Sequence, residues 1–130
     1  MDKMGREAII SIGSNVPDKR ERVEKACEEL KNRFYSFQVS SIYTTPAVGR
    51  CAGQPDYCNA VARFSTTDDY ETLRLFFKTM ESDYGRVRHS DAVALIPLDI
   101  DIVMWDGAVL RQRDMGQEDM RIGLEQLGLL

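Results

Sequence analysis

The strongest constraint on the fold is a short run near the end of the chain, residues 97–105, with the sequence PLDIDIVMW. Apolar and acidic residues alternate here, and a period of two is typical of a β-strand that is buried on one face. Asp99 and Asp101 are expected to share the exposed face, with Cα atoms roughly 6.6–7 Å apart. The residues expected on the buried face are Leu98, Ile100, Ile102 and Met104.

Two carboxylates at that spacing repel each other. A magnesium ion would relieve the repulsion, because Mg²⁺ prefers oxygen ligands and usually takes one or two carboxylates plus substrate phosphates. A strand whose second face is simply exposed to water explains the same alternation. The pattern by itself therefore leaves both a metal site and a solvated strand face open.

The rest of the chain also divides by the period of its apolar residues. Strands are predicted over residues 7–14, 36–45, 56–66 and 97–105. Amphipathic helices are predicted over residues 18–34 and 68–84. Asp68 and Glu71 have the spacing of a capping box for the second helix, and Gly85 suits the position just after its end. Residues 46–55 and 86–96 are expected to be loops.

The resulting order, β-α-β-β-α-β, is the signature of a ferredoxin-like α+β domain, with two helices on one face of an antiparallel sheet. We expect the opposite face and its loops to be available for ligands. Asp106-Gly107 predicts a tight turn, after which residues 108–111 return as a short strand. Residues 112–130 are ambiguous, because apolar residues at helical spacing are interrupted by Gly116 and Gly123.

Composition narrows the class of function. The chain has 130 residues and a formal net charge of -4, which suits one domain and gives no field that attracts nucleic acid. No apolar run approaches the ~20 residues that span a bilayer. Residues 1–6 are polar and lack the apolar core of a signal peptide, so a cytoplasmic protein is expected. Three cysteines without paired spacing fit reduced thiols.

Two further groups of residues have a chemistry of their own. Arg86 and Arg88 follow the second predicted helix and can clamp phosphate oxygens, although placement at the negative end of a helix explains them equally well. Tyr57 and Asn59 share one face of a predicted strand and suit a flat heteroaromatic ligand. A core tyrosine and a turn asparagine are the alternative interpretation.

Taken together and in order, five short motifs resemble those of the 6-hydroxymethyl-7,8-dihydropterin pyrophosphokinase family of folate biosynthesis. They occupy residues 12–15, 40–46, 54–61, 85–88 and 98–102. The resemblance covers about residues 7–107. We therefore expect residues 1–130 to form a single domain, with a family-like core at residues 7–107 and a divergent tail at residues 108–130.

The resemblance implies an activity and a set of residues. The family moves a pyrophosphoryl group from ATP to the hydroxymethyl oxygen of the pterin and releases AMP. By resemblance, Asp99 and Asp101 bind two magnesium ions, and together with Arg86 and Arg88, which face the ATP phosphates, they form the catalytic set. The implied substrate-binding residues are Thr45, Pro46, Val48, Tyr57, Asn59 and Glu81. The implied partners are a pterin and ATP, with no nucleic acid or membrane, for a monomer or weak homo-oligomer.

The chain departs from the family pattern in two places. Where the family carries an Arg-Trp-Gly-Pro-Arg segment over ATP, residues 89–96 read HSDAVALI, with neither arginine nor tryptophan. Residues 108–130 contain neither the family's Val-Pro-His segment nor its later Arg-x-Phe segment. We therefore expect a weak or substrate-shifted pyrophosphokinase. The alternative is a catalytically inactive ligand- or protein-binding module on the same scaffold.

Overall fold

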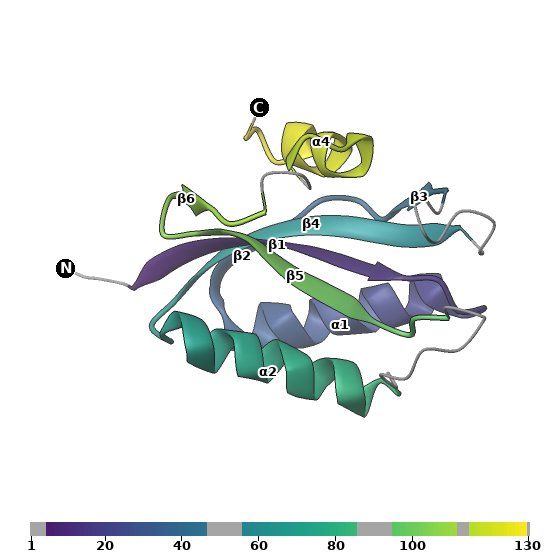
Figure 1. The fold of residues 1–130 in the computed structure, drawn as a ribbon, viewed down its shortest axis with the longest axis horizontal. Helices are drawn as coiled ribbons and strands as arrows, with labels where there is room; N and C mark the ends of the chain where they lie inside the picture. Colours follow the sequence, from purple (N-terminus) through teal and green to yellow (C-terminus); the bar gives the residue numbers. More distant parts are fainter. Residues whose placement is uncertain (1–4, 47–55, 86–94, 112–114, 130) are drawn as a thin grey trace.

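A six-stranded antiparallel sheet organises the computed structural model, which describes residues 5–46, 56–85, 95–111 and 115–129 (Figure 1). The strands are β1 (Arg6–Ser14), β2 (Tyr35–Val39), β3 (Tyr43–Thr45), β4 (Tyr57–Thr66), β5 (Asp99–Trp105) and β6 (Ala108–Val109). The helices are α1 (Lys19–Arg33), α2 (Tyr70–Asp83) and α4 (Glu118–Gln126). The sheet order is β2-β4-β1-β5-β6, and β3 also pairs with β4. The predicted ferredoxin-like α+β class is confirmed.

The strand predicted over residues 36–45 is two strands, which corrects the sequence-based boundary. The interruption lies at Ser40, whose side chain enters the hydrogen bonding of the sheet. Its backbone N–H donates to the Val61 carbonyl at 2.9 Å, and its hydroxyl oxygen accepts from the Val61 N–H at 3.0 Å. Because a side chain replaces one backbone acceptor, the ladder breaks between β2 and β3.

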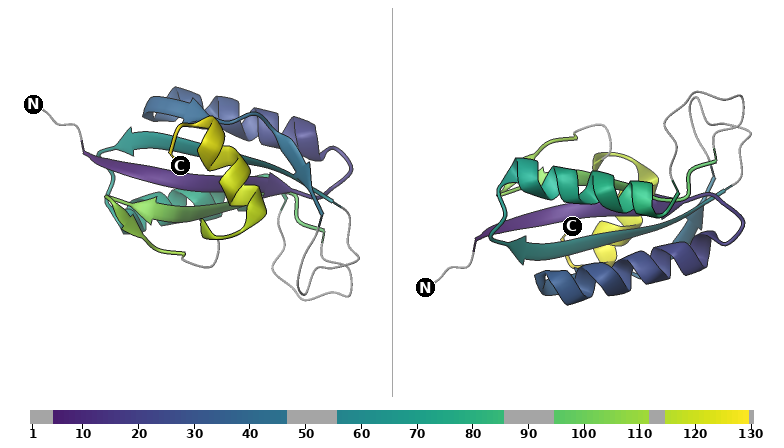
Figure 2. Two further views of the ribbon diagram at one scale, coloured as in Figure 1. Left: turned by 90° about the horizontal axis from the view of Figure 1, so that it is seen from above. Right: turned by 90° about the horizontal axis from the view of Figure 1, so that it is seen from below.

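Helices α1 and α2 lie side by side on one face of the sheet, as predicted (Figures 1 and 2). Their apolar stripes bury Val23, Ala26 and Leu30 from α1 and Leu73, Phe77 and Met80 from α2. Phe34 stacks on Phe64 of β4 with ring centroids 4.2 Å apart. Burying each large side chain is worth about 1.5–3 kcal/mol, so this layer is the main core.

The capping residue of α2 differs from the predicted one by a single position. The capping side chain belongs to Asp69, whose Oδ1 accepts from the Thr72 N–H at 2.8 Å, and this bond lowers the pKa of the Asp69 carboxyl. The predicted cap, Asp68, instead forms an ion pair with Arg33 of α1 at 3.0 Å. Gly85 follows the helix with φ of +100°, as its predicted position requires.

Helix α4 crosses the opposite face of the sheet, which we expected to be available for ligands (Figure 1). It builds a second, smaller core there from Ile9, Val61, Val103, Met120 and Leu124. The expectation is therefore wrong for the part of that face beneath α4. Gly123, which weakened the helix prediction, is what allows close packing, because a Cβ atom there would lie 2.3 Å from Val61 Cγ2.

The face assignment along β5 changes at a bulge. Ile10 pairs with Ile102 but Ile9 pairs with Met104, so Val103 is an extra residue in the strand. Leu98, Ile100 and Ile102 lie in the main core as predicted. Met104 packs against the second core instead, since the extra residue reverses the alternation. Among the helices in the described part of the chain, none is long and apolar enough to cross a membrane.

Candidate active site

Strand register places the predicted site residues in rows across the sheet. One row runs through Tyr43 of β3, Asn59 of β4, Gly13 of β1 and Asp99 of β5. In the next row, Ser11 of β1 lies opposite Asp101. Directly opposite residues share a face of the sheet, and this is the face that α4 partly covers. Pairing thus brings residues 43, 59, 99 and 101 together from three strands, with β1 between β4 and β5.

A cavity of about 470 Å³ opens over these rows, and several predicted site residues line it. They are Thr45, Pro46, Tyr57, Asn59, Asp99 and Asp101. The lining also includes Tyr43, Gly13 and other sheet residues, together with Arg111 and with Gln117, Asp119 and Met120 at the start of α4. Arg86, Arg88 and Val48 lie outside the described residues.

One end of the cavity is built from an aromatic ring and an amide. Thr45 and Tyr57 are directly opposed in the β3–β4 ladder, and the Asn59 side-chain amide donates a hydrogen bond to the Thr45 hydroxyl. Gly13 leaves space for this group, because a Cβ atom there would lie 2.8 Å from Asn59 Oδ1 and 3.6 Å from Tyr57 Cδ2. This end presents a flat apolar surface beside polar groups of fixed orientation.

The other end is acidic. Asp99 and Asp101 project from alternate positions of β5 and are both half-buried. The guanidinium Nη1 of Arg111 lies 3.8 Å from Asp101 Oδ1, and both side chains are partly exposed. An ion pair of this length and exposure contributes little to stability. Exchanging this ion pair for a contact with a phosphate would by itself cost little.

The donor set at this end suits magnesium. The described residues contain no group of three or more His, Cys, Asp or Glu side chains arranged to hold a metal ion. Mg²⁺ nevertheless usually takes only one or two carboxylate ligands from the protein, and water and substrate phosphates complete its octahedral coordination. The two neighbouring carboxylates that line this cavity match that requirement.

A second cavity of about 270 Å³ adjoins the first, and Asp101 and Arg111 line both. Its other walls include Tyr70, Arg74 and Lys78 of α2. Three cationic side chains beside an aromatic ring suit an anionic ligand that also has a flat or apolar part.

Sequence analysis missed Arg111 and Tyr43 as residues of the site. The signal for Arg111 was the Asp106-Gly107 turn, because a hairpin with Trp105 opposite Ala108 returns residue 111 toward the Asp101 end of β5. The signal for Tyr43 was its position two residues before Thr45, which puts both on one strand face. The contribution of α4 had no comparable signal.

Glu81 lies away from the cavity, beneath the other face of the sheet. It is 1% exposed, and its Oε2 accepts from the Ile100 N–H at 2.8 Å. Lys78 Nζ lies 3.9 Å from Oε1 of the same carboxylate. The hydrogen bond from Ile100 links Glu81 of α2 to β5. Glu81 therefore helps to fix the position of β5 and of the Asp99–Asp101 pair on it.

We expect Glu81→Leu to lower the free energy of unfolding in urea by about 1–3 kcal/mol, because the buried Ile100 N–H loses an acceptor. Glu81→Gln keeps an acceptor oxygen and is the matched variant, with a smaller loss expected. If Glu81→Leu unfolds at the urea concentration of the unchanged protein, the proposed support of β5 is wrong.

The protein is a small antiparallel α+β domain. Its cavity has paired carboxylates at one end and an aromatic ring with an amide at the other. Such a cavity can bind a metal-bound phosphate beside a flat ring. The family model for 7,8-dihydro-6-hydroxymethylpterin-pyrophosphokinase matches residues 9–124 of the 130-residue chain. The chain belongs to this family. Its members are pterin pyrophosphokinases of folate biosynthesis that use ATP and Mg²⁺. The match extends beyond residue 107 and takes in most of α4.

Proposed function

We propose that this protein transfers a pyrophosphoryl group from ATP to the hydroxymethyl oxygen of a dihydropterin. That oxygen attacks the β-phosphorus, the bond between the β-phosphorus and the α,β-bridging oxygen breaks, AMP leaves, and the hydroxyl proton is lost. The observation that supports this most directly is the single cavity lined by both Tyr57 and Asn59 and the Asp99–Asp101 pair.

The pterin occupies the Tyr57–Asn59 end. Its ring packs on the Tyr57 face, and the Asn59 amide, oriented by Thr45, reads its polar edge. Its hydroxymethyl group then points along the row that runs from Asn59 through Gly13 to Asp99. The absence of a side chain at Gly13 keeps this path open.

The phosphates occupy the acidic end, with magnesium held by Asp99 and Asp101. We propose two ions, as the resemblance implies. Bound magnesium neutralises phosphate charge and polarises the phosphoryl oxygens. The chain's own contribution is to place Arg111 Nη1 3.8 Å from Asp101 Oδ1, with Asp99 lining the same cavity, so that all three groups can contact one phosphate chain.

The second cavity suits the rest of the nucleotide. Arg74, Lys78 and Arg111 bring positive charge, and Tyr70 offers an aromatic face. Asp101 and Arg111 line both cavities, so a nucleotide there presents its phosphates to the first. Arg86 and Arg88 face the phosphates in this proposal, on the strength of the resemblance alone.

The alternative is the catalytically inactive ligand- or protein-binding module, taken here in its ligand-binding form. The observation that favours it is the sequence of residues 89–96, which lacks both arginines and the tryptophan of the family segment. Such a protein keeps the cavity, binds pterin and nucleotide, and releases no AMP.

Both functions require the flat-ligand site, so its test comes first. We expect 6-hydroxymethylpterin to shift the amide and side-chain resonances of Tyr57 and Asn59 in NMR titrations. Tyr57→Leu should weaken binding by about 0.5–1.5 kcal/mol, the value of an aromatic contact beyond its area. Tyr35→Leu is the matched control, because Tyr35 is 67% exposed on β2. Unchanged resonances at saturating pterin would sink the proposed function in either form.

A further inference from the structure

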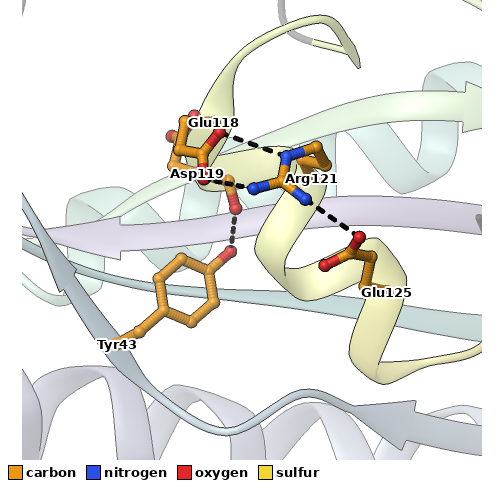
Figure 3. A network of polar contacts seen from close by, with 5 residues as sticks. All are labelled: Tyr43, Glu118, Asp119, Arg121 and Glu125. Atoms are coloured by element: carbon orange, nitrogen blue, oxygen red, sulfur yellow. Dashed lines mark hydrogen bonds and ion pairs between the residues drawn. The ribbon is translucent and has the colours of Figure 1, made fainter.

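Helix α4 is tied to the sheet at three places beside the cavity. Met120 and Leu124 are buried in the second core. The Gln126 side-chain oxygen accepts from the Ser41 N–H at 2.7 Å, between β2 and β3. The Tyr43 hydroxyl donates a hydrogen bond to the Asp119 carbonyl in the first turn of α4 (Figure 3). These ties leave the start of the helix over the cavity, where Gln117, Asp119 and Met120 line it.

Tyr43, which donates the hydrogen bond to the Asp119 carbonyl, also lines the cavity. Tyr43 lies directly opposite Asn59 in the β3–β4 ladder and shares its face. Burial raises the pKa of the Tyr43 hydroxyl, and the charge of Asp119 adds to the rise. The hydroxyl is therefore a proton donor at physiological pH. The Tyr43 side chain thus lines the ligand cavity and also contacts α4 above it.

The fit between Tyr43 and α4 is close. A Cβ atom on Gly123 would lie 2.9 Å from the Tyr43 hydroxyl oxygen and 2.3 Å from Val61 Cγ2. Contacts that short force a neighbour to move, and two of the Gly123 neighbours belong to the sheet. The position of α4 is therefore sensitive to the position of the Tyr43 ring.

We propose that α4 is a cover for the pterin end of the cavity and that Tyr43 couples it to the bound ligand, which makes Tyr43 a positioning residue. This rests on the proposed function. A pterin beside Asn59 packs against the Tyr43 ring, fixes the hydroxyl under Asp119 and so stabilises α4. By thermodynamic reciprocity, loss of the Tyr43–Asp119 bond weakens pterin binding by the factor by which pterin stabilises the bond.

The test uses Tyr43→Phe, which keeps the ring and removes the hydroxyl. In the unliganded variant, we expect the backbone amides of residues 120–126 to exchange hydrogen faster than in the unchanged protein. We also expect the dissociation constant of 6-hydroxymethylpterin to rise by about 3- to 10-fold, as the loss of one hydrogen bond implies. Pterin should protect the same amides in the unchanged protein and less so in the variant. Tyr35→Phe, on exposed β2, should change neither quantity.

Gly123→Ala tests the same coupling from the helix side. Its Cβ should displace α4, with faster exchange and weaker pterin binding. The double variant Gly123→Ala/Val61→Ala removes the nearest atom, Val61 Cγ2, and should recover part of both. Equal pterin affinity in Tyr43→Phe and the unchanged protein overturns the coupling and leaves the proposed function standing. An unchanged protein that binds no pterin overturns both.

Discussion

Asp101→Asn should abolish magnesium-dependent binding of nucleotide and reduce AMP release at least about 100-fold, while the protein stays folded. The substitution keeps the shape of a side chain in the middle of β5, opposite Ser11, and removes only its charge. One of the two carboxylates that face the phosphate end of the cavity is then lost. Stabilisation of phosphoryl charge by bound metal is worth several kcal/mol, and each 1.36 kcal/mol is tenfold in rate.

Calorimetry with α,β-methylene-ATP, with and without Mg²⁺, measures the binding part of this prediction. Asp106→Asn is the matched control, because Asp106 is an exposed carboxylate of the same hairpin and lies at the turn between β5 and β6. Asparagine also tolerates the positive φ of 51° at that position. Nucleotide binding that is the same with and without Mg²⁺ in the unchanged protein would rule out the metal assignment.

Restoring charge to residues 89–96 should raise the rate of AMP release by orders of magnitude. The variant is Ala92→Arg, Val93→Trp and Ile96→Arg, which returns the side chains of the family segment. Arginines over a pyrophosphoryl group in transfer stabilise the transition state more than the ground state. In GTP hydrolysis a single arginine is worth about 10³–10⁵ in rate. Magnesium binding at Asp99 and Asp101 should change little.

The structure bears on one of these three positions, since Ala92 and Val93 lie outside the described residues. Ile96 is held through its backbone: its N–H donates to Asn15 Oδ1 at 2.5 Å, and its carbonyl accepts from the Asn15 N–H at 3.1 Å. A new side chain at residue 96 leaves these bonds in place, and circular dichroism serves as the folding control. If the restored protein binds pterin and Mg-ATP but still releases no AMP, the binding-module function is correct.

Much of the fold could be predicted because periodicity reports local burial. The alternation in β5 and the apolar stripes of α1 and α2 place the main core correctly. Met104 was assigned to the wrong face, since a bulge at Val103 depends on the register with β1 and leaves no local pattern. The break between β2 and β3 likewise depends on a Ser40–Val61 contact across 21 residues.

The site residues could also be predicted where they depend on local spacing, but not where they depend on packing between distant elements. Tyr57, Asn59, Asp99 and Asp101 stand at alternate positions of two strands, and the sequence shows this spacing directly. Their meeting in one cavity follows from the pairing of both strands with β1. The roles of Tyr43 and Gly123 depend on how α4 docks, and a glycine that weakens a helix in isolation is the residue that lets this one pack.

The central claim is that this cavity joins a pterin to ATP. Its most direct test is AMP formation by the purified protein supplied with ATP, Mg²⁺ and 6-hydroxymethyl-7,8-dihydropterin. We predict slow release of AMP that requires all three, matched by an equal amount of pyrophosphorylated pterin, and that disappears in Asp101→Asn. No AMP above background, under conditions where pterin and Mg-ATP are both bound, would contradict it.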